Sequence, residues 1–266
     1  MKNVLGAFRA EWLRLSTGRA GWLLPLAALL GGAYAFSLGV AAERGLFGAL
    51  TGFYLAAAGA TGAAITCAAV GALLAASAVG SDFASGVART ALCRPVGRPA
   101  WLLARLAALG SGVALVFLAA AVGALLVGLL RFGLGSVSED NYVLVSGSLL
   151  LAQLAVGVAT AALGTTVAVA AGGVLGMGFG RSGPAVASTA VLGACLLALG
   201  RWPQLEALLP TTFLTSGLDL VARLAQGLAS SHASDVAPRA VLVFLAWLLV
   251  VLGLGVELLR RKDIVS

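Results

Sequence analysis

Charged residues are scarce in this chain of 266 residues. Only 10% of the residues are charged, whereas 61% are hydrophobic and the mean hydropathy is +1.05. Because soluble domains carry about 25% charged residues, a chain this apolar cannot hide its surface in one water-soluble globule. Apolar and polar residues do not alternate recurrently, which disfavours a lipid-facing β-barrel. The composition therefore predicts an all-α, polytopic membrane protein.

Residues that bind metals or form disulfides are also few. The chain has one histidine, two methionines and three cysteines, and Cys67, Cys93 and Cys195 lie far apart in sequence. An odd number without paired spacing argues against a disulfide framework or a CxxC metal site. A copper or zinc pathway would show clusters of His, Cys or Met. We therefore expect no metal and no cofactor to be bound by this chain.

Long apolar runs are present instead, and about 20 such residues cross the hydrocarbon as a helix. The runs predict six transmembrane helices within a single transmembrane domain, 1–266. Before them, residues 1–20 show apolar residues at helical spacing opposite basic ones, which predicts an amphipathic helix in the membrane interface; a short solvated tail is the alternative. We expect a glycine-rich loop at 172–183 and a long outer or re-entrant segment at 200–238. The six spans are expected at about residues 21–41, 53–79, 101–130, 142–171, 184–199 and 239–258.

The charges of the connecting segments predict an orientation. Twelve of the 17 Lys and Arg residues fall on the side that holds the N-terminus, the 80–105 region, the 172–183 loop and the tail. Cytosolic loops carry an excess of Lys and Arg, so both termini are predicted to be cytoplasmic, which requires an even number of spans. The net charge of +7 then reflects membrane topology, and no nucleic acid is expected as a partner.

The predicted spans lack charge at mid-membrane. Arg105 and Glu257 lie near predicted cytosolic ends, where long side chains are expected to reach the interface. Ion-coupled transporters usually need an intramembrane carboxylate, and none is visible, so a secondary transporter is disfavoured.

Small residues are frequent in two of the spans. They predict close helix packing, although a general bias toward Ala and Gly explains them equally well. They are Gly59, Gly62, Ala63 and Gly71 in the second span and Gly157, Ala161 and Gly164 in the fourth.

Two motifs suggest enzymatic chemistry that their context does not support. Residues 178–183 match G-x-G-x-x-G but lack a βαβ setting. Ser182 stands in a G-x-S-G pattern, yet a serine nucleophile needs an adjacent base, and His232 lies in a predicted outer loop on the opposite side. No G-x-x-x-x-G-K-[ST] motif occurs, so this chain is not expected to bind ATP through a P-loop. We expect no enzymatic activity in this chain.

The polar stretch 80–105 is the most informative segment. Ser81 or Asp82 can cap a short helix that Pro95 terminates. Phe83 and Val87 would share one face of this helix, and the face could dock into a partner protein. A solvated loop carrying basic residues is the alternative.

The order of these features resembles the permease subunits of type-2 ABC exporters. In the 80–105 stretch the resemblance rests on an acidic residue, a glycine, a short helix with arginine, an Arg-Pro pair and basic residues entering the third span. Further matches are residues 10–13 (AEWL), a Leu-Pro at 209–210 before the last span and the basic tail 260–263 (RRKD). Arg105 stands where many relatives carry lysine. The resemblance covers essentially the whole chain, through loose motifs whose order and spacing agree.

The resemblance implies a permease that forms the translocation path of an ATP-driven exporter, as a homodimer in the inner or plasma membrane. Two copies of a separate ATPase subunit would bind ATP and Mg and drive it. Membrane lipids are further partners. ATPase coupling is expected at a short cytosolic coupling helix and the residues after it: Asp82, Phe83, Gly86, Arg89, Arg94, Pro95 and Arg98.

The resemblance also implies roles for two other regions. The interfacial helix, with Phe8, Glu11 and Trp12, would add a second ATPase contact. An outer gate or re-entrant segment is expected at Pro210, Phe213, Asp219 and Arg223, with Asp219 and Arg223 able to pair at i,i+4; a plain surface hairpin is the alternative there. Two other functions stay open: a scaffold that uses the ATPase for mechanical work without transport, and an intramembrane enzyme with Ser182 as nucleophile.

Overall fold

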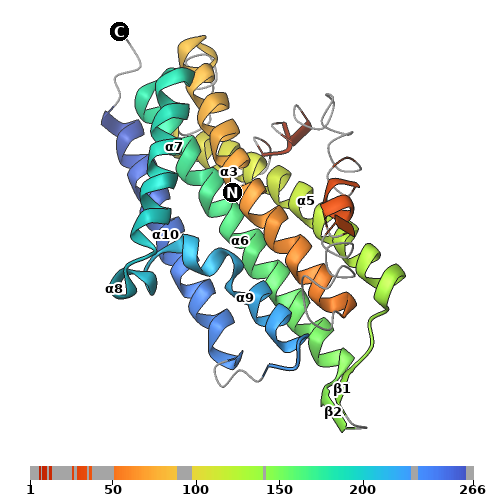
Figure 1. Cartoon of the computed structure of the whole chain (residues 1–266). Coiled ribbons are helices and arrows are strands. Elements are labelled where there is room, and N and C mark those ends of the chain that lie inside the picture. The colour runs from red at the N-terminus through yellow and green to blue at the C-terminus, as the bar shows by residue number, and fades with distance from the viewer. Residues whose placement is uncertain are drawn as a thin grey trace.

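Five long helices form an elongated bundle in the computed structural model (Figure 1). The structure describes residues 51–88, 98–139, 142–228 and 233–261, and a few residues between 6 and 37. In these ranges the long helices are α3 (Gly52–Ala84), α5 (Arg98–Phe132), α6 (Gly147–Phe179), α7 (Ser182–Leu199) and α10 (Ala233–Arg261). Short elements lie between them: the antiparallel hairpin of β1 (Val137–Glu139) and β2 (Tyr142–Val145), then α8 (Pro203–Glu206) and α9 (Pro210–Leu224).

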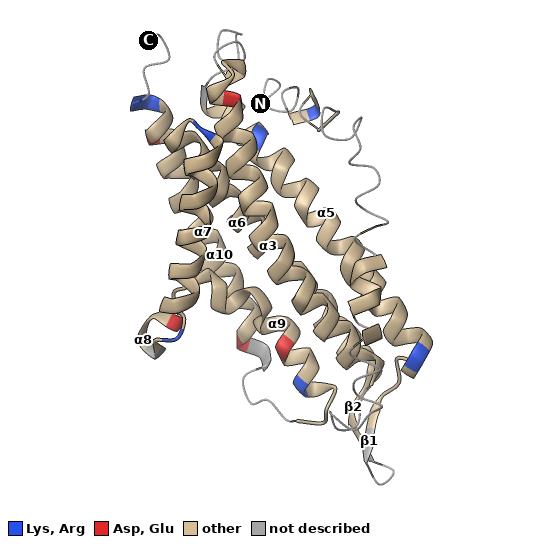
Figure 2. Cartoon of the chain, turned by 45° about the horizontal axis from the view of Figure 1, so that its top comes forward, with Lys and Arg blue, Asp and Glu red and all other residues tan. Residues whose placement is uncertain are grey.

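All five long helices are long and apolar enough to cross a membrane. The shortest, α7, has 18 residues and spans about 27 Å at 1.5 Å per residue, close to the ~30 Å of a bilayer core. Charged residues of the described part lie toward the ends of the bundle (Figure 2). The chain is therefore an α-helical, multi-pass membrane protein.

The first predicted span and the interfacial helix fall mostly outside the described residues. Within 21–41, the described positions Leu26, 29–34 and 36–37 are helical. In the N-terminal segment, the rings of Phe8 and Trp12 stack with their centroids 6.1 Å apart, as expected for residues one helical turn apart. Glu11 lies outside the described residues.

The helix ends differ from the predicted span limits because polar caps set them. The side chain of Thr51 accepts a hydrogen bond from the Tyr54 amide and starts α3, and Ser146 does the same for α6 through Leu149. The predicted fourth span was therefore placed too early, since residues 142–145 form a strand and the helix runs from 147 to 179. Hydropathy marks the depth of the hydrocarbon, whereas hydrogen bonding of the backbone ends a helix.

The prediction of a loop at 172–183 is wrong. Residues 172–179 are the last quarter of α6, and the connection to α7 is a tight turn at Gly180, whose φ of +63° is left-handed, and Arg181. Gly172 and Gly176 face α3, and a Cβ on Gly176 would lie 2.5 Å from the carbonyl oxygen of Ala76. In a membrane helix, glycine permits close approach of a neighbouring backbone; here that use prevails over its tendency to form loops.

The small residues of the predicted spans do mediate close packing, within one chain. A Cβ on Gly71 would meet Val113 at 2.8 Å, and one on Gly157 would meet the backbone of Gly217 on α9 at 3.0 Å. Gly164 faces the ring of Phe244 on α10. Helix α6 thereby contacts α3, α5, α7, α9 and α10 and forms the centre of the bundle.

Candidate functional site

The candidate site lies where α3 ends and α5 begins. The same end of the bundle holds the α6–α7 turn and the last turns of α10 (Figures 1 and 2). Gly80 brings α3 against that turn, since a Cβ there would lie 2.9 Å from the carbonyl of Arg181. One apolar cluster joins all four elements through Val79, Trp101, Met177 and Leu259.

A buried ion pair ties α3 to α5 at this end. The Arg105 Nη2 atom lies 2.8 Å from Asp82 Oδ2, and the two side chains are only 6% and 7% exposed. Asp82 belongs to the last turn of α3, and Arg105 is the eighth residue of α5. Because water is largely excluded, removing either partner would leave an uncompensated charge. The pair therefore holds the two helix ends at a defined separation.

Two expectations about these residues are wrong. Asp82 does not cap a separate short helix, because α3 continues without a break to Ala84. Arg105 does not extend to the interface, because it is buried against Asp82. The partner lies 23 positions away in sequence, and only the packing of α3 on α5 brings the two side chains together.

Helix α3 ends at a glycine turn. Ser85 is the C-cap residue, and Gly86 follows with a φ of +76°, a left-handed conformation that favours glycine. The next two residues are again helical, with Val87 exposed and Ala88 fully buried against the apolar cluster. Gly86 therefore turns the chain out of α3.

Phe83 is partly buried and packs against the apolar cluster at this end of the bundle. Its ring packs edge-on against Trp101 of α5, with centroids 6.0 Å apart and an interplanar angle of 83°. Edge-to-face aromatic pairs add to the stabilisation from buried area. The contact is a second link between the two helix ends that flank the loop.

The remaining predicted coupling residues are only partly located. Arg89, Arg94 and Pro95 lie outside the described residues. Arg98 is the first residue of α5, and only its backbone is described. The segment that contains them is thus attached at both ends to helices joined by the ion pair and by the Phe83–Trp101 contact.

At the other end of the molecule, α9 packs along the bundle. Pro210 occupies the first turn of α9, where its missing N–H costs little, and Phe213 packs against the cluster around Phe244. The Asp219 carboxylate accepts a hydrogen bond from the hydroxyl of Thr215 at 2.9 Å, and Arg223 lies in the last turn. The apolar face of α9, including Leu218, is buried against α3 and α6.

Trp247 has a role that its sequence position did not indicate. It is the middle residue of α10, and its indole Nε1 donates a hydrogen bond to the carbonyl of Leu208 at 2.8 Å. The connection between α8 and α9 is thereby fixed against the central part of a spanning helix. An indole N–H in an apolar segment usually finds an acceptor.

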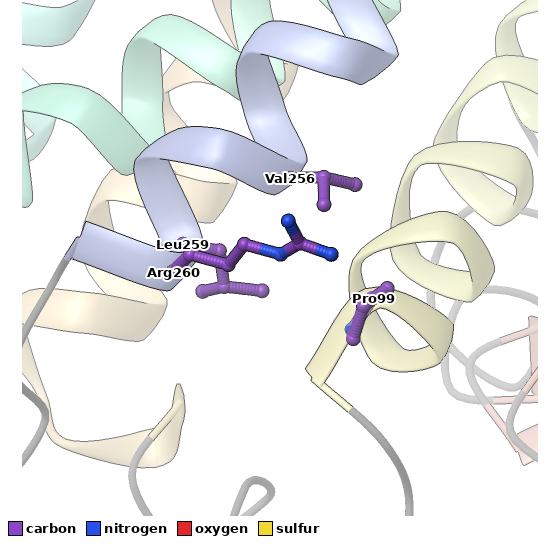
Figure 3. A pocket seen from close by; sticks show the side chains of 4 residues that line it. All are labelled: Pro99, Val256, Leu259 and Arg260. Carbon is purple, nitrogen blue, oxygen red and sulfur yellow. The ribbon is translucent and has the colours of Figure 1, made fainter.

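A small cavity opens beside the site, between the start of α5 and the end of α10. It encloses about 250 Å³ and is lined by Pro99, Val256, Leu259 and Arg260 (Figure 3). Among the described residues, no group of three or more His, Cys, Asp or Glu side chains is placed to hold a metal ion.

The two enzyme-like motifs take other conformations. Gly178 and Phe179 belong to α6, and Ser182 begins α7, so residues 178–183 do not form a phosphate-binding loop after a strand. His232 lies outside the described residues. In the comparisons with known proteins, no protein-family model and no curated protein matches the sequence.

Proposed function

We propose that this protein is the transmembrane permease subunit of a type-2 ABC exporter. It would form the translocation path as a homodimer, and two copies of a separate ATPase subunit would bind ATP and Mg. This chain itself would bind no cofactor and catalyse no reaction. The observation that carries the proposal is the buried Asp82–Arg105 pair, which clamps the ends of the segment expected to contact the ATPase.

A segment that receives force must be attached rigidly to the helices that it moves. Closely packed protein interiors have low compressibility and transmit strain. Here the segment between Gly86 and Arg98 leaves α3 and enters α5 next to an ion pair, an aromatic contact and an apolar cluster. A push on this segment would therefore move α3 and α5 together.

The distribution of charge favours an external source of energy. Five long segments of the chain contain no charged residue: 52–81, 106–130, 147–179, 182–199 and 240–256. A carrier driven by ion gradients usually needs a carboxylate or polar relay at these depths. An ATPase acting from one end of the bundle needs none.

The proposed orientation places the Asp82 end in the cytoplasm, with both termini on that side of an inner or plasma membrane. It rests on the excess of Lys and Arg in the segments that meet at that end. The N-terminal segment, with Phe8, Glu11 and Trp12, would lie at the same interface. Helix α9, with Pro210, Phe213, Asp219 and Arg223, would then line the outer side of the path and act as its gate.

The decisive experiment combines co-purification with transport. The permease is expected to co-purify with an ATPase encoded beside it, and vesicles containing both should accumulate cargo only with ATP. Cargo movement without any ATPase would contradict the proposal. Charge reversal at Arg89 or Arg94 should lower the yield of the complex, whereas Arg201→Glu, near α8, is the matched control and should not.

The role of the Asp82–Arg105 ion pair is tested separately with Asp82→Asn. If the ion pair transmits force, ATP hydrolysis by the assembled complex should persist while transport falls. The exchanged pair Asp82→Arg with Arg105→Asp restores opposite charges and should recover part of the transport. Equal losses of complex, hydrolysis and transport in both variants would indicate a purely structural role.

A scaffold that performs mechanical work without transport is the second proposal. It relies on the same Asp82–Arg105 ion pair and the same ATPase, so only a transport assay in reconstituted vesicles distinguishes it from the exporter. ATP-dependent complex formation without cargo movement would favour the scaffold. Ser182→Ala should leave either function intact, and loss of function in that variant would instead point to an intramembrane enzyme.

A further inference from the structure

The cavity between α5 and α10 combines apolar walls with one positive charge. Pro99, Val256 and Leu259 supply the walls, and the side chain of Arg260 extends from α10 into the space that separates it from α5 (Figure 3). None of these residues takes part in the Asp82–Arg105 pair. The cavity is thus distinct from the Asp82–Arg105 ion pair.

The guanidinium of Arg260 is available for a ligand. Glu257, one turn earlier on α10, is already bonded to Arg261 at 2.7 Å. Within the described ranges, no hydrogen bond or ion pair joins Arg260 to another residue. A guanidinium offers five N–H donors and no acceptor, so the ligand that it selects is an anion.

The depth of Arg260 matches that of lipid phosphates. The uncharged part of α10 runs from Ala240 to Val256 and covers about 25 Å at 1.5 Å per residue. The hydrocarbon core of a bilayer is about 30 Å thick. Arg260 lies one turn beyond this stretch, which places its side chain among the headgroups.

The size and surroundings of the cavity favour a headgroup of an amphiphile. Its volume of about 250 Å³ is below the roughly 300–1,000 Å³ of pockets that enclose whole drug-sized ligands. Leu249 of α10 is 73% exposed and lies two helical turns before Val256 on the same face of the helix, so apolar surface on this face continues from the cavity toward the membrane interior. A phosphate can bind Arg260 while the acyl chains cover this surface.

We propose that the cavity binds the phosphate of an anionic phospholipid through Arg260. Basic pockets between transmembrane helices bind acidic lipid headgroups in other proteins. The proposal depends only on the membrane character of the chain, so it stands or falls independently of the exporter function. A bound lipid would bridge the ends of α5 and α10 beside the Asp82–Arg105 ion pair.

Native mass spectrometry of the purified protein in detergent tests this proposal. Phosphatidylglycerol is titrated against phosphatidylcholine with the same acyl chains. We expect tighter binding of phosphatidylglycerol, and a loss of about tenfold in Arg260→Gln, the size expected for one charge-assisted hydrogen bond. The matched control is Arg261→Gln, which removes the same charge from the next residue but should retain most of the affinity.

A second variant fills the cavity without changing charge. Val256→Trp should weaken binding of phosphatidylglycerol to a similar extent, with thermal unfolding confirming that the variant is folded. Equal losses in Arg260→Gln and Arg261→Gln would overturn the proposal, because they would show general charge attraction. Equal affinity for phosphatidylcholine would also overturn it, as would complete displacement by glycerol phosphate, which would identify a free anion as the ligand.

Discussion

Helices α6 and α10 both contain an apolar stretch long enough to cross a membrane, but the two stretches have opposite environments. Half of the most apolar stretch of α6 is buried in the protein, compared with 17% for α10. Gly176 of α6 lies against the backbone of α3, whereas a Cβ on Gly253 of α10 would meet nothing within 4 Å. Because lipid tails are as apolar as Leu, hydrophobicity does not tell the two environments apart; the fit of one helix against another does.

Ion pairs show the same contrast. The Asp82–Arg105 pair is enclosed between α3 and α5, while the Glu257–Arg261 pair lies on the surface of α10, with side chains 48% and 78% exposed. An enclosed pair is costly to break because the remaining charge stays buried. An exposed pair contributes little, since water and salt screen it.

The largest expected effect comes from breaking the enclosed pair. Arg105→Met should lower the free energy of unfolding by about 3–5 kcal/mol, because it leaves the Asp82 carboxylate without its charged partner. The control Arg261→Met removes the partner of Glu257 and should cause no measurable change. Denaturant-induced unfolding in micelles, followed by tryptophan fluorescence, measures both. Similar losses in the two variants would mean that burial does not distinguish the pairs.

A pair of leucines tests the contrast between helices directly. Leu150 of α6 is fully buried, so Leu150→Ala should cost about 2–5 kcal/mol through lost contacts and the cavity left behind. Leu249 of α10 is 73% exposed, and Leu249→Ala should change the stability of the monomer by about 0.5 kcal/mol or less. A large loss for Leu249→Ala at high protein concentration only would reveal a second copy covering α10.

The glycines provide a third test. Gly176→Leu should destabilise the protein by about 1–3 kcal/mol, because the new side chain must push α6 away from Ala76 of α3. Gly253→Leu is the control on α10, where the added side chain meets open space in the structure. Thermal unfolding of the two variants should separate them clearly. No difference would contradict the close α3–α6 contact.

The smallest expected effect concerns Trp247. Trp247→Phe retains the ring but removes the donor to the Leu208 carbonyl, which should cost about 1 kcal/mol. Trp202→Phe is the control, since Trp202 is exposed on the α8 side of the molecule. Limited proteolysis of the 200–209 connection should be faster only in the first variant. Unchanged proteolysis would show that the hydrogen bond does not hold this connection in place.

The features that the sequence predicts correctly are those that depend on one physical property. Apolar runs of about the hydrocarbon thickness identified the five candidate spans that the structure describes. Their ends were less predictable, because capping by Thr51 and Ser146 depends on local hydrogen bonds that hydropathy does not register. The glycines at 172–176 were misassigned to a loop, since glycine favours turns in water and close helix contacts in lipid.

The candidate site was located by sequence but misread in detail. The stretch after the second span was identified as unusual from its charges, and Asp82 and Arg105 were both noted. Their pairing was missed, because each was interpreted with its sequence neighbours only. A charged residue at the end of an apolar run requires a partner or access to water, and that requirement could have prompted a search for an acid opposite Arg105.

The sequence by itself determined that the chain is a multi-pass membrane protein, where five of its apolar helices lie and where charge is excluded. These properties follow from the cost of transferring each residue into hydrocarbon, which is nearly independent of its neighbours in space. Only the tertiary structure decided that α6 is central, that α10 is peripheral and that Asp82 faces Arg105. Those outcomes depend on which small residues allow two backbones to approach, and that is a property of pairs of helices.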